Sequence, residues 1–445
     1  MIFKEPEYDL VIVGGGSAGM FGAARVSKLL PKEKKILLLE KTSSLGNKLC
    51  LSGNGQCNFT NACNMNEFKK HYGENGNFLK NALFNLSNDN LINLFKEMRF
   101  ETVTRDDKKI FPKSLRAEDI KFLFLKFAEQ YPVEIMLNSE LKEINYSSEE
   151  ILLNIINSGT NVKIKTNYLI LCTGGASYPH TGSDGAIERL LAKFDILVKP
   201  FKPALAIPKI ESVEKNEVSH YSLSCLSGIT LQNVRLSIYK KQNSKELMLG
   251  EIKNNDINYQ LLNFNNVSGD LLFTHTGLSG PLILDNSRYF EEGDKIRIYL
   301  TEFNNNNDID TKILELLNKH PKRKIINILH LLGIPERIVD HLMQGVNVDI
   351  RAAELSKLER KYISKKLLFM EFLIVKFNNI DSAMCSRGGV DLSEIDKNTM
   401  MLKKMPNVFV AGECIDIDGD SGGYNIHAAF ATMNLILKYL SGLMR

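Results

Sequence analysis

Residues 9–19 read DLVIVGGGSAG and join a short apolar run to a glycine-rich turn. The apolar run, Asp9 to Val13, is typical of a strand buried on both faces of a parallel sheet. A helical pattern follows and stops at Pro31, and a second apolar run, Ile36 to Leu39, ends at Glu40. The order of strand, glycine turn, helix and strand predicts a complete β-α-β unit.

The spacing Gly14-x-Gly16-x-x-Gly19 predicts dinucleotide binding because it stands between a strand and a helix. Gly14 permits the tight turn, Gly16 lets the backbone approach a pyrophosphate, and Gly19 lets the helix pack closely against the sheet. The helix N-terminus offers unpaired N–H groups to the phosphates. Glu40 follows at the end of the second strand, where a carboxylate accepts hydrogen bonds from ribose hydroxyls.

A second glycine-rich turn lies near the end of the chain. The strand-like residues Val408 to Ala411 lead to Gly412-Glu413, then to Asp416 and Gly422-Gly423, before a predicted helix from Asn425 to Leu440. Such a turn suits an extended FAD, with the helix N-terminus facing the flavin pyrimidine. An ordinary glycine loop is the alternative, and only the N-terminal motif favours the cofactor.

The alternation of helices and strands stops near Pro200 to Pro203, which predicts a domain boundary. Short β-like runs such as Thr230 to Tyr239 follow, then a helical pattern from Asp310 to about Ser364. The other expected elements are the helices Asn77 to Met98 and Ala117 to Gln130, the strands Val133 to Leu137, Tyr168 to Cys172, Lys295 to Thr301 and Phe372 to Phe377, and the loops Lys48 to Asn61 and Asn304 to Asn307.

The composition describes a globular chain with little excess charge. Of its 445 residues 44% are hydrophobic, and the net charge of +4 is too small to favour nucleic acid or an anionic membrane. No apolar run reaches the roughly 18 residues of a membrane span. Seven cysteines without a C-x-x-C pair favour a reducing compartment. We therefore expect a cytoplasmic protein with a small-molecule substrate, no nucleic-acid partner and no membrane partner; the oligomeric state stays open.

Residues 48–61, KLCLSGNGQCNFTN, resemble the K-L-x-x-S-G-x-G-R-C-N-x-T-N loop of a bacterial flavoprotein family. That family includes aminoacetone oxidase and the BaiN-type bile-acid dehydro-reductases. Residues 173–179, 269–281, 387–390 and 412–425 match its other blocks in order, so the resemblance covers nearly the whole chain. It implies an α/β fold, in which a glutathione-reductase-like Rossmann FAD domain is discontinuous and carries an inserted β-barrel plus helical domain.

The resemblance also implies domain limits. The first part of the FAD-binding domain is expected at 1–198 and its second part at 377–445. The inserted substrate domain is expected at 199–376, with the β-barrel at about 199–303 and the helical part at about 308–366.

The FAD-binding residues implied by the resemblance are spread along the chain. Gly16, Ser17 and Ala18 are expected to hold the pyrophosphate, Glu40 the adenosine ribose, and the Leu141 backbone the adenine. The complete expected set is Gly14, Gly16, Ser17, Ala18, Gly19, Glu40, Lys41, Lys48, Ser52, Gly53, Asn54, Gln56, Cys57, Asn58, Leu141, Thr173, Gly174, Gly412, Glu413, Asp416, Gly423, Tyr424, Asn425 and Ile426.

Two segments depart from the family pattern. Gln56 stands where the family usually has Arg, which removes a fixed cation next to the flavin or substrate. Residues 181–185 form a shorter loop than usual. Both departures bear on the substrate more than on FAD binding.

The catalytic residues are not decided by the sequence, and the candidates are Cys57, Tyr178, His180 and His427. The histidines lie in matching motifs and either transfer protons or are structural, the second being the more frequent case. The spacing of Cys57 from its neighbouring cysteines does not fit a redox dithiol. The sequence contains no H-x-H motif, no H-E-x-x-H motif and no Cys–His cluster, so it predicts no metal site.

The sequence thus predicts an FAD-dependent oxidoreductase. The first hypothesis is an NAD(P)H-dependent reductase of an activated C=C or C=O, with NAD(P)H as a transient reductant because only one dinucleotide motif is visible. The alternatives are an oxygen-dependent oxidase of a small, aminoacetone-like amine and a non-catalytic flavin-binding or RNA-associated protein. The basic run 322–324 is typical of a solvated helix start. Residues 278–280 either shape a substrate cavity or start a helix.

Overall fold

The strand–glycine–helix–strand stretch folds as predicted in the computed structural model, which describes residues 5–214, 217–219, 223–241, 259–262, 267–275, 277–303, 305–377 and 380–444. β1 (Glu7–Val13) runs into α1 (Ser17–Leu29), and β2 (Ile36–Leu39) returns parallel to β1. All four residues of β2 are buried, as expected for a strand covered on both faces. The local sequence therefore forms the first β-α-β unit.

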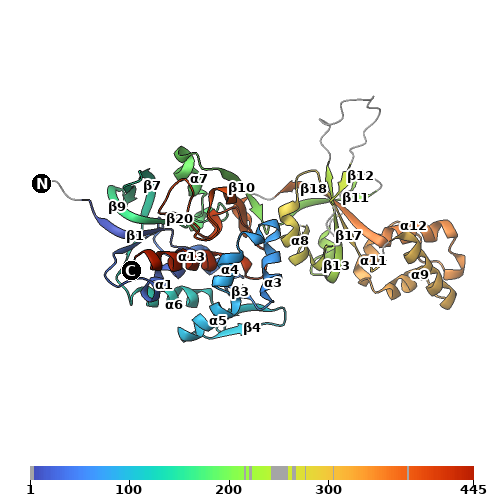
Figure 1. The fold of residues 1–445 in the computed structure, drawn as a ribbon. Helices are drawn as coiled ribbons and strands as arrows, with labels where there is room; N and C mark the ends of the chain where they lie inside the picture. Colours follow the sequence, from blue (N-terminus) through green and yellow to red (C-terminus); the bar gives the residue numbers. More distant parts are fainter. Residues whose placement is uncertain are drawn as a thin grey trace, which may run out of the picture. The chain divides into compact units, whose positions relative to one another are not determined.

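This unit belongs to a larger sheet that, within the described residues, has seven strands (Figure 1). The strand order is β6-β2-β1-β9-β8-β7, and β20 pairs with the C-terminal half of β9. The pairs β1–β2, β1–β9, β2–β6 and β9–β20 are parallel, whereas β7, β8 and β9 pair antiparallel. The bounds are β6 (Val133–Met136), β7 (Ser139–Tyr146), β8 (Ile151–Asn157), β9 (Thr160–Leu171) and β20 (Val408–Val410).

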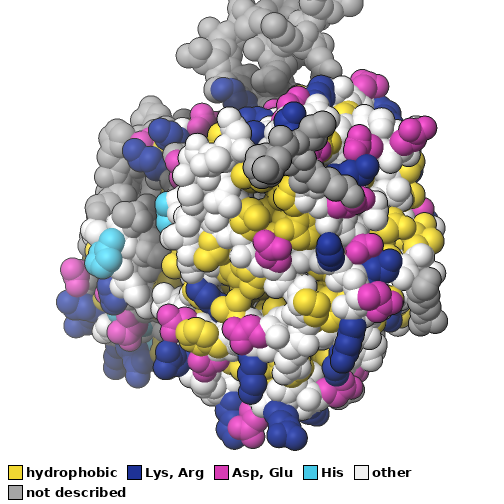
Figure 2. All heavy atoms as spheres, turned by 90° about the vertical axis from the view of Figure 1, so that its left-hand side faces the viewer, with side chains coloured by type: hydrophobic (Ala, Val, Ile, Leu, Met, Phe, Trp, Pro, Cys, Tyr) yellow, Lys and Arg dark blue, Asp and Glu magenta, His cyan; other side chains and the backbone are white. Residues whose placement is uncertain are grey.

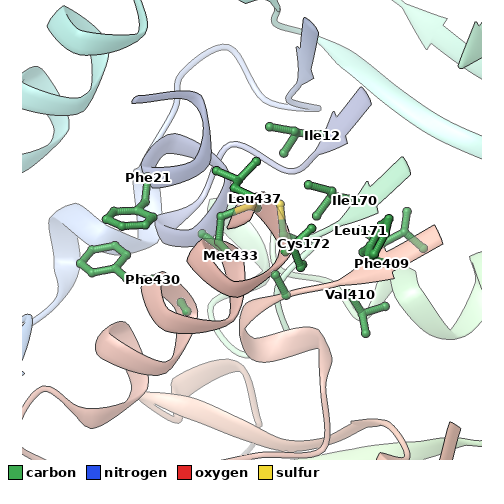
Figure 3. Close-up of a cluster of buried hydrophobic side chains, with 14 of the residues drawn as sticks. Ile12, Phe21, Ile170, Leu171, Cys172, Phe409, Val410, Phe430, Met433 and Leu437 are labelled. Atoms are coloured by element: carbon green, nitrogen blue, oxygen red, sulfur yellow. The ribbon is translucent and has the colours of Figure 1, made fainter. Parts of the chain in front are cut away.

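Aromatic packing fixes the helices against this sheet. The Phe21 ring on α1 stacks on the Phe430 ring of α13 (Tyr424–Leu443) with 4.8 Å between ring centroids. Phe124 of α6 (Ala117–Ala128) packs edge-on against both rings. Figure 3 shows Phe21 and Phe430 facing each other, and it shows Met433 and Leu437 of α13 between these rings and the labelled residues of β9 and β20. The two helices expected at 117–130 and 425–440 are thus confirmed, and α13 joins the end of the chain to its beginning.

Three expected elements differ from the structure. The single helix expected from Asn77 to Met98 is wrong, because Ser87 accepts a hydrogen bond from the backbone of Asn90 and starts a new helix. The chain there forms α4 (Lys80–Asn85) and α5 (Asn88–Glu97).

The loop expected at 48–61 contains α2 (Asn47–Leu51) and ends in β3 (Thr60–Asn61). Gly46, with a φ of 71°, makes the left-handed turn that begins α2.

The loop expected at 304–307 is also shorter than predicted. Residue 304 lies outside the described residues, and α9 (Asn306–Lys319) already begins at the third asparagine. Asn305 accepts hydrogen bonds from the backbones of Asn307 and Asp308 and so caps this helix. Asn305 of the asparagine run is therefore the N-cap of α9, which could not be predicted from the composition of the run.

The chain divides into two compact units, Met1–Leu205 with Asn379–Arg445, and Ala206–Asn378. In the first unit β10 (Val198–Ala204) pairs antiparallel with β19 (Cys385–Val390). The boundaries expected at 198/199 and 376/377 fall inside β10 and β18 (Phe369–Phe377). Proline-rich composition at 200–203 therefore marks an edge strand of the first unit, where proline is tolerated.

The remaining elements of the first unit surround the sheet and include a three-stranded sheet with the order β3-β5-β4. Their bounds are α3 (Met65–Phe68), η1 (Lys69–Asn77), β4 (Thr102–Thr104), β5 (Lys109–Pro112), η2 (Pro179–Thr181), α7 (Ala186–Leu191), η3 (Ala192–Phe194), η8 (Ile380–Ser382), η9 (Leu392–Glu394) and η10 (Gly412–Cys414).

The second unit contains an antiparallel sheet in the order β12-β11-β18-β17-β13-β15-β16, with β14 on β13. The end strand β16 approaches β11, the second strand from the other end, since a Cβ on Gly277 of β16 would lie 3.4 Å from the Ile210 side chain of β11. The sheet is therefore nearly closed and barrel-like. The further bounds are β11 (Pro208–Glu214), β12 (Glu217–Ser219), η4 (Leu223–Leu226), β13 (Thr230–Lys241), β14 (Tyr259–Leu261), β15 (Val267–Thr274), β16 (Gly277–Ser279) and β17 (Lys295–Tyr299).

Helices complete the second unit. α8 (Pro281–Asn286) begins directly after residues 278–280, so that turn starts a helix; residue 276 of the same motif lies outside the described residues. The others are η5 (Ser287–Tyr289), α9, α10 (Ile325–Leu329), η6 (His330–Leu332), α11 (Glu336–Leu342), η7 (Ala352–Glu354) and α12 (Lys357–Leu368). The predicted α/β class, with a barrel-like and helical insertion, is confirmed. No helix in the described part of the chain has the length and hydropathy needed to cross a membrane.

Candidate cofactor-binding site

The glycine turn after β1 combines tight packing with open space. A Cβ on Gly14, whose φ is +109°, would lie 2.3 Å from the carbonyl oxygen of Cys172. A Cβ on Gly19 would lie 1.9 Å from the carbonyl oxygen of Gly14. A Cβ on Gly16 would meet nothing within 4 Å. The turn therefore excludes side chains toward the sheet and leaves room beside the N-terminus of α1, where Ser17 and Ala18 begin the helix.

Glu40 is held in place at the end of β2. Its Oε2 accepts a hydrogen bond of 2.7 Å from the backbone N–H of Gly15, and its Oε1 accepts two of 2.8 Å from the N–H and hydroxyl of Thr42. A carboxylate offers about four lone-pair sites, so one stays available for a hydroxyl. Glu40 is only 9% exposed, and these bonds fix its orientation before any ligand binds.

The shortened loop at 181–185 packs against the same strand end. Asp184 forms an ion pair of 2.7 Å with Lys41. A Cβ on Gly182 would lie 3.1 Å from the Thr42 side chain. Lys41 thus holds this loop beside Glu40, an arrangement that the sequence left undecided.

A third group of polar side chains joins distant parts of the chain. Lys48 Nζ lies 2.9 and 2.6 Å from the two carboxylate oxygens of Glu413, and 2.5 Å from the Ser177 hydroxyl. Glu413 Oε1 also accepts hydrogen bonds from the backbone N–H and the hydroxyl of Ser386. Lys48 and Glu413 were expected at the site from the sequence, whereas neither serine was, although Ser177 lies in the matching block 173–179 and Ser386 directly precedes the block 387–390.

The loop expected to run along the flavin has a left-handed backbone. Gly53, Asn54, Gly55 and Cys57 all have φ between 55° and 79°. Cys57 is fully buried, and burial raises the pKa of its thiol to about 12, so the thiol is protonated at neutral pH. Ser52 lies in the same loop, and its hydroxyl donates to the Leu49 carbonyl.

Two amides of this loop have defined partners. Asn58 donates from its Nδ2 to the carbonyls of Thr60 and Ile110, while its buried Oδ1 accepts no hydrogen bond from the described residues. Gln56 Oε1 accepts a 2.5 Å hydrogen bond from Arg105, which also stacks over Phe111. A guanidinium therefore stands beside position 56 although the family's arginine is absent there.

The second glycine turn lies against the first. A Cβ on Gly412, whose φ is +75°, would lie 3.3 Å from the Cβ of Ala18 on α1. Gly174 has a φ of +76°, and the buried Thr173 hydroxyl has no hydrogen-bond partner within the described ranges. The unpartnered Thr173 hydroxyl and the open space at Gly16 thus both lie at the turn before the N-terminus of α1. These residues fit the pyrophosphate and ribose of a dinucleotide.

Other expected FAD ligands have roles within the protein. The Asp416 carboxylate accepts from Lys199 at 2.7 Å and from the backbone of Gly388. Asn425 exchanges two hydrogen bonds with the backbone of Gly419. Leu141 is buried on β7 beside a bulge. Gly423, Tyr424 and Ile426 lie at the start of α13, and a Cβ on Gly423 would meet the Thr60 backbone at 2.6 Å.

The catalytic candidates lie in contrasting environments. His427 is fully buried, and burial lowers its pKa to about 4. Its Nδ1 bonds the Thr60 hydroxyl and its Nε2 the Leu86 carbonyl, both at 2.8 Å, which favours a structural role. His180 is exposed and packs edge-on against Tyr178. Catalysis by Cys57, Tyr178, His180 or His427 stays a prediction.

The structure instead brings together a cluster that the sequence analysis missed. Cys63, His71, Asp420 and Tyr424 meet at the N-terminus of α13. No motif signals it, because its members come from separate segments. Among the described residues no group of His, Cys, Asp and Glu has an arrangement that could hold a metal ion.

The family of the protein follows from comparison with known proteins. The model of the "HI0933-like protein Rossmann domain" family matches residues 8–437. The chain belongs to this family. The HI0933-like proteins include FAD-dependent oxidoreductases, so the predicted family, FAD cofactor and enzyme class are confirmed at this level.

Curated relatives of this HI0933-like protein align over almost their full length. "Ribosomal RNA dihydrouridine synthase" of Haemophilus influenzae is 27% identical over 424 residues, covering 95% of this chain and 96% of the relative. The Escherichia coli protein of the same name is 25% identical, covering 96% of each chain. "3-dehydro-bile acid delta(4,6)-reductase" of Clostridium scindens is 22% identical, covering 97% of each chain.

Proposed function

We propose that this protein reduces a carbon–carbon double bond conjugated to a carbonyl, with FAD as the redox cofactor and NAD(P)H as the electron donor. One observation carries the proposal: the names of the three full-length relatives describe this one reaction. Dihydrouridine is uridine saturated at a double bond conjugated to a ring carbonyl. The double bonds of a delta(4,6) bile acid with a 3-oxo group are conjugated in the same way. The proposal therefore favours C=C over C=O among the acceptors that the sequence left open.

The residues of the chain would position the cofactor and tune its surroundings. Backbone N–H groups at Ser17 and Ala18 would bind the pyrophosphate, and the free lone pair of Glu40 would accept a ribose hydroxyl. The ion pair of Lys48 with Glu413 ties α2 to the second glycine turn and so closes the site from two ends of the sequence. Bound FAD, once reduced, would supply the hydride.

For the acceptor, we propose a uridine in ribosomal RNA. Two of the three relatives carry that substrate in their names, at 27% and 25% identity against 22% for the bile-acid enzyme. The net charge of +4 gives no independent support, and the face drawn in Figure 2 mixes basic and acidic side chains. The earlier expectation of a small-molecule substrate without nucleic acid is the competing hypothesis.

An anaerobic experiment separates the alternatives. The purified holoenzyme is mixed with NADPH, and the flavin absorbance is expected to bleach. Ribosomal RNA from cells lacking the gene, or 2-cyclohexen-1-one, is then added to the reduced enzyme. Return of the flavin absorbance together with dihydrouridine in the digested RNA supports the proposal.

Each competing hypothesis gives a different result in the same experiment. Reoxidation by 2-cyclohexen-1-one alone supports a small-molecule enone reductase. Bleaching by an aminoacetone-like amine but not by NADPH supports the oxidase. Absence of bleaching with either donor supports a flavin-binding protein without this activity.

A further inference from the structure

The cluster at the N-terminus of α13 joins four polar side chains by short contacts. His71 Nδ1 lies 2.8 Å from the Asp420 carboxylate, and the Asp420 backbone N–H donates to the His71 carbonyl at 2.9 Å. The imidazole stacks on the Tyr424 ring with 4.1 Å between centroids. The Cys63 sulfur lies 3.5 Å from the Tyr424 hydroxyl. The ring of His71 is thus held on one face by Tyr424 and at one edge by Asp420.

The backbone around the cluster is fixed as well. Asn88 donates from its Nδ2 to the carbonyls of Asn61 and Cys63, both at 2.8 Å. The N–H of Cys63 donates to the Asn61 side chain at 3.0 Å. The Tyr72 hydroxyl donates to the Tyr424 carbonyl at 2.8 Å. The side chains of the cluster are therefore positioned before any ligand arrives.

The charge state of His71 follows from these contacts. Burial of the ring opposes its charge, but hydrogen bonds to Asp420 and Cys63 outweigh burial and raise the pKa of His71 to about 9. The titratable groups around the ring are Asp420, Cys63, Tyr424 and Tyr72. At neutral pH the cluster contains an imidazolium whose side chain is 36% exposed, next to a thiol that is 6% exposed.

The cluster adjoins the turn expected to face the flavin. A Cβ on Gly422 would contact the Tyr424 ring at 3.2 Å and the Asn61 amide at 3.5 Å. α13 is a 20-residue helix, and its N-terminus favours negative charge. The Cys63 sulfur contacts the hydroxyl of Tyr424, the first residue of this helix, so the thiol lies beside the helix N-terminus.

We propose that Cys63 is the proton donor of the double-bond reduction, and that His71 and Asp420 are positioning residues that restore its proton. This inference rests on the proposed function. One carbon of the conjugated double bond receives the hydride, and the other carbon receives the S–H proton of Cys63 as the C=C π bond breaks. His71 returns a proton to the thiolate, and solvent reprotonates His71. The substrate gains two electrons and two hydrogens, and the reduced flavin is oxidised.

The test uses the anaerobic holoenzyme and separates the two half-reactions. Cys63→Ala is expected to be reduced by NADPH at the wild-type rate, while its reoxidation by 2-cyclohexen-1-one or ribosomal RNA slows about 100-fold or more, as for loss of a general acid. Cys63→Ser conserves volume and keeps the flavin bound if the alanine variant loses it. The matched controls are Cys225→Ala and His341→Gln, whose side chains form a Cys–His contact of 3.4 Å in the other unit.

A second readout does not depend on flavin. The His71 resonance, assigned by its loss in His71→Gln, is expected to titrate near pH 9 in the wild type and at lower pH in Asp420→Asn and Cys63→Ala. Wild-type reoxidation rates in both Cys63 variants overturn this inference alone. Failure of both acceptors to reoxidise the wild-type enzyme overturns the proposed function and this inference with it.

Discussion

The two ends of the candidate cofactor site are built in different ways. At the N-terminus of α1, recognition rests on backbone and space: Gly16 leaves a volume open, and Glu40 is held by neighbouring N–H groups. At the N-terminus of α13, the cluster consists of side chains, with Cys63 and Tyr424 separated by 361 positions. A site made of backbone needs only glycine spacing and is visible in sequence. A site made of side chains appears only when the chain folds.

Substitution of the glycines is expected to have the largest effect at the α1 end of the site. Gly16→Glu is expected to abolish FAD binding, because its side chain fills the open volume and repels phosphate. The apoprotein should keep its unfolding free energy within about 1 kcal/mol, since a Cβ at Gly16 meets nothing within 4 Å. The flavin-to-protein ratio and chemical denaturation measure the two effects.

Gly14→Ala is the contrasting control. Its Cβ would lie 2.3 Å from a carbonyl oxygen at a φ of +109°, so we expect destabilisation by about 3 kcal/mol even without FAD. Retention of stoichiometric flavin by Gly16→Glu would contradict our account of the turn.

Substitution of Lys48 or Glu413 tests whether the ion pair between these side chains stabilises the fold. Lys48→Met or Glu413→Gln is expected to cost about 2 kcal/mol in unfolding free energy, below the value for a fully buried pair because the side chains are 23% and 20% exposed. A double-mutant cycle measured by urea unfolding should show coupling. Strict additivity of the two single effects would show that the pair contributes nothing of its own.

At the α13 end, the ion pair of His71 with Asp420 is expected to make stability depend on pH. The pKa of His71 is raised from 6.5 to about 9 on folding, so the protonated ring stabilises the fold fully below pH 6.5. This contribution is lost as the pH rises through about 9. The difference in unfolding free energy between wild type and His71→Gln should therefore shrink from pH 6 to pH 9.5. Asp420→Asn should remove most of this pH dependence, and an unchanged profile would refute the ion pair.

The smallest expected effect concerns Gln56. Gln56→Arg would restore the family's arginine but place it beside Arg105. Because Arg105 is exposed, repulsion should change the unfolding free energy by less than about 0.5 kcal/mol. Urea denaturation at low and high salt measures it. A destabilisation above about 1 kcal/mol would show that Arg105 has no room to move.

Prediction from the sequence succeeded where the signal was local. The strands at 9–13 and 36–39 and the helix at 117–130 follow from periodicity and breakers within short windows. It failed where one side chain changed the outcome, as when Ser87 divided an expected helix and Asn305 capped another. A helix cap depends on a single hydrogen bond from one polar side chain. The periodicity of hydrophobic residues therefore does not show where such a cap ends one helix and begins another.

The β-α-β unit, the glycine turn and the family could be predicted from the sequence alone, because they depend on residues close together in the chain or on ordered motifs. Only the tertiary structure decided that Lys48 meets Glu413, that Arg105 stands beside Gln56, and that Cys63 and His71 share a cluster. These contacts depend on strand pairing: β20 pairs with β9 and brings the C-terminal segment beside the N-terminal half, and β3 pairs with β5 and brings the segments of Gln56 and Arg105 together. Side chains from both ends of the chain then lie within hydrogen-bond distance, which no local pattern encodes.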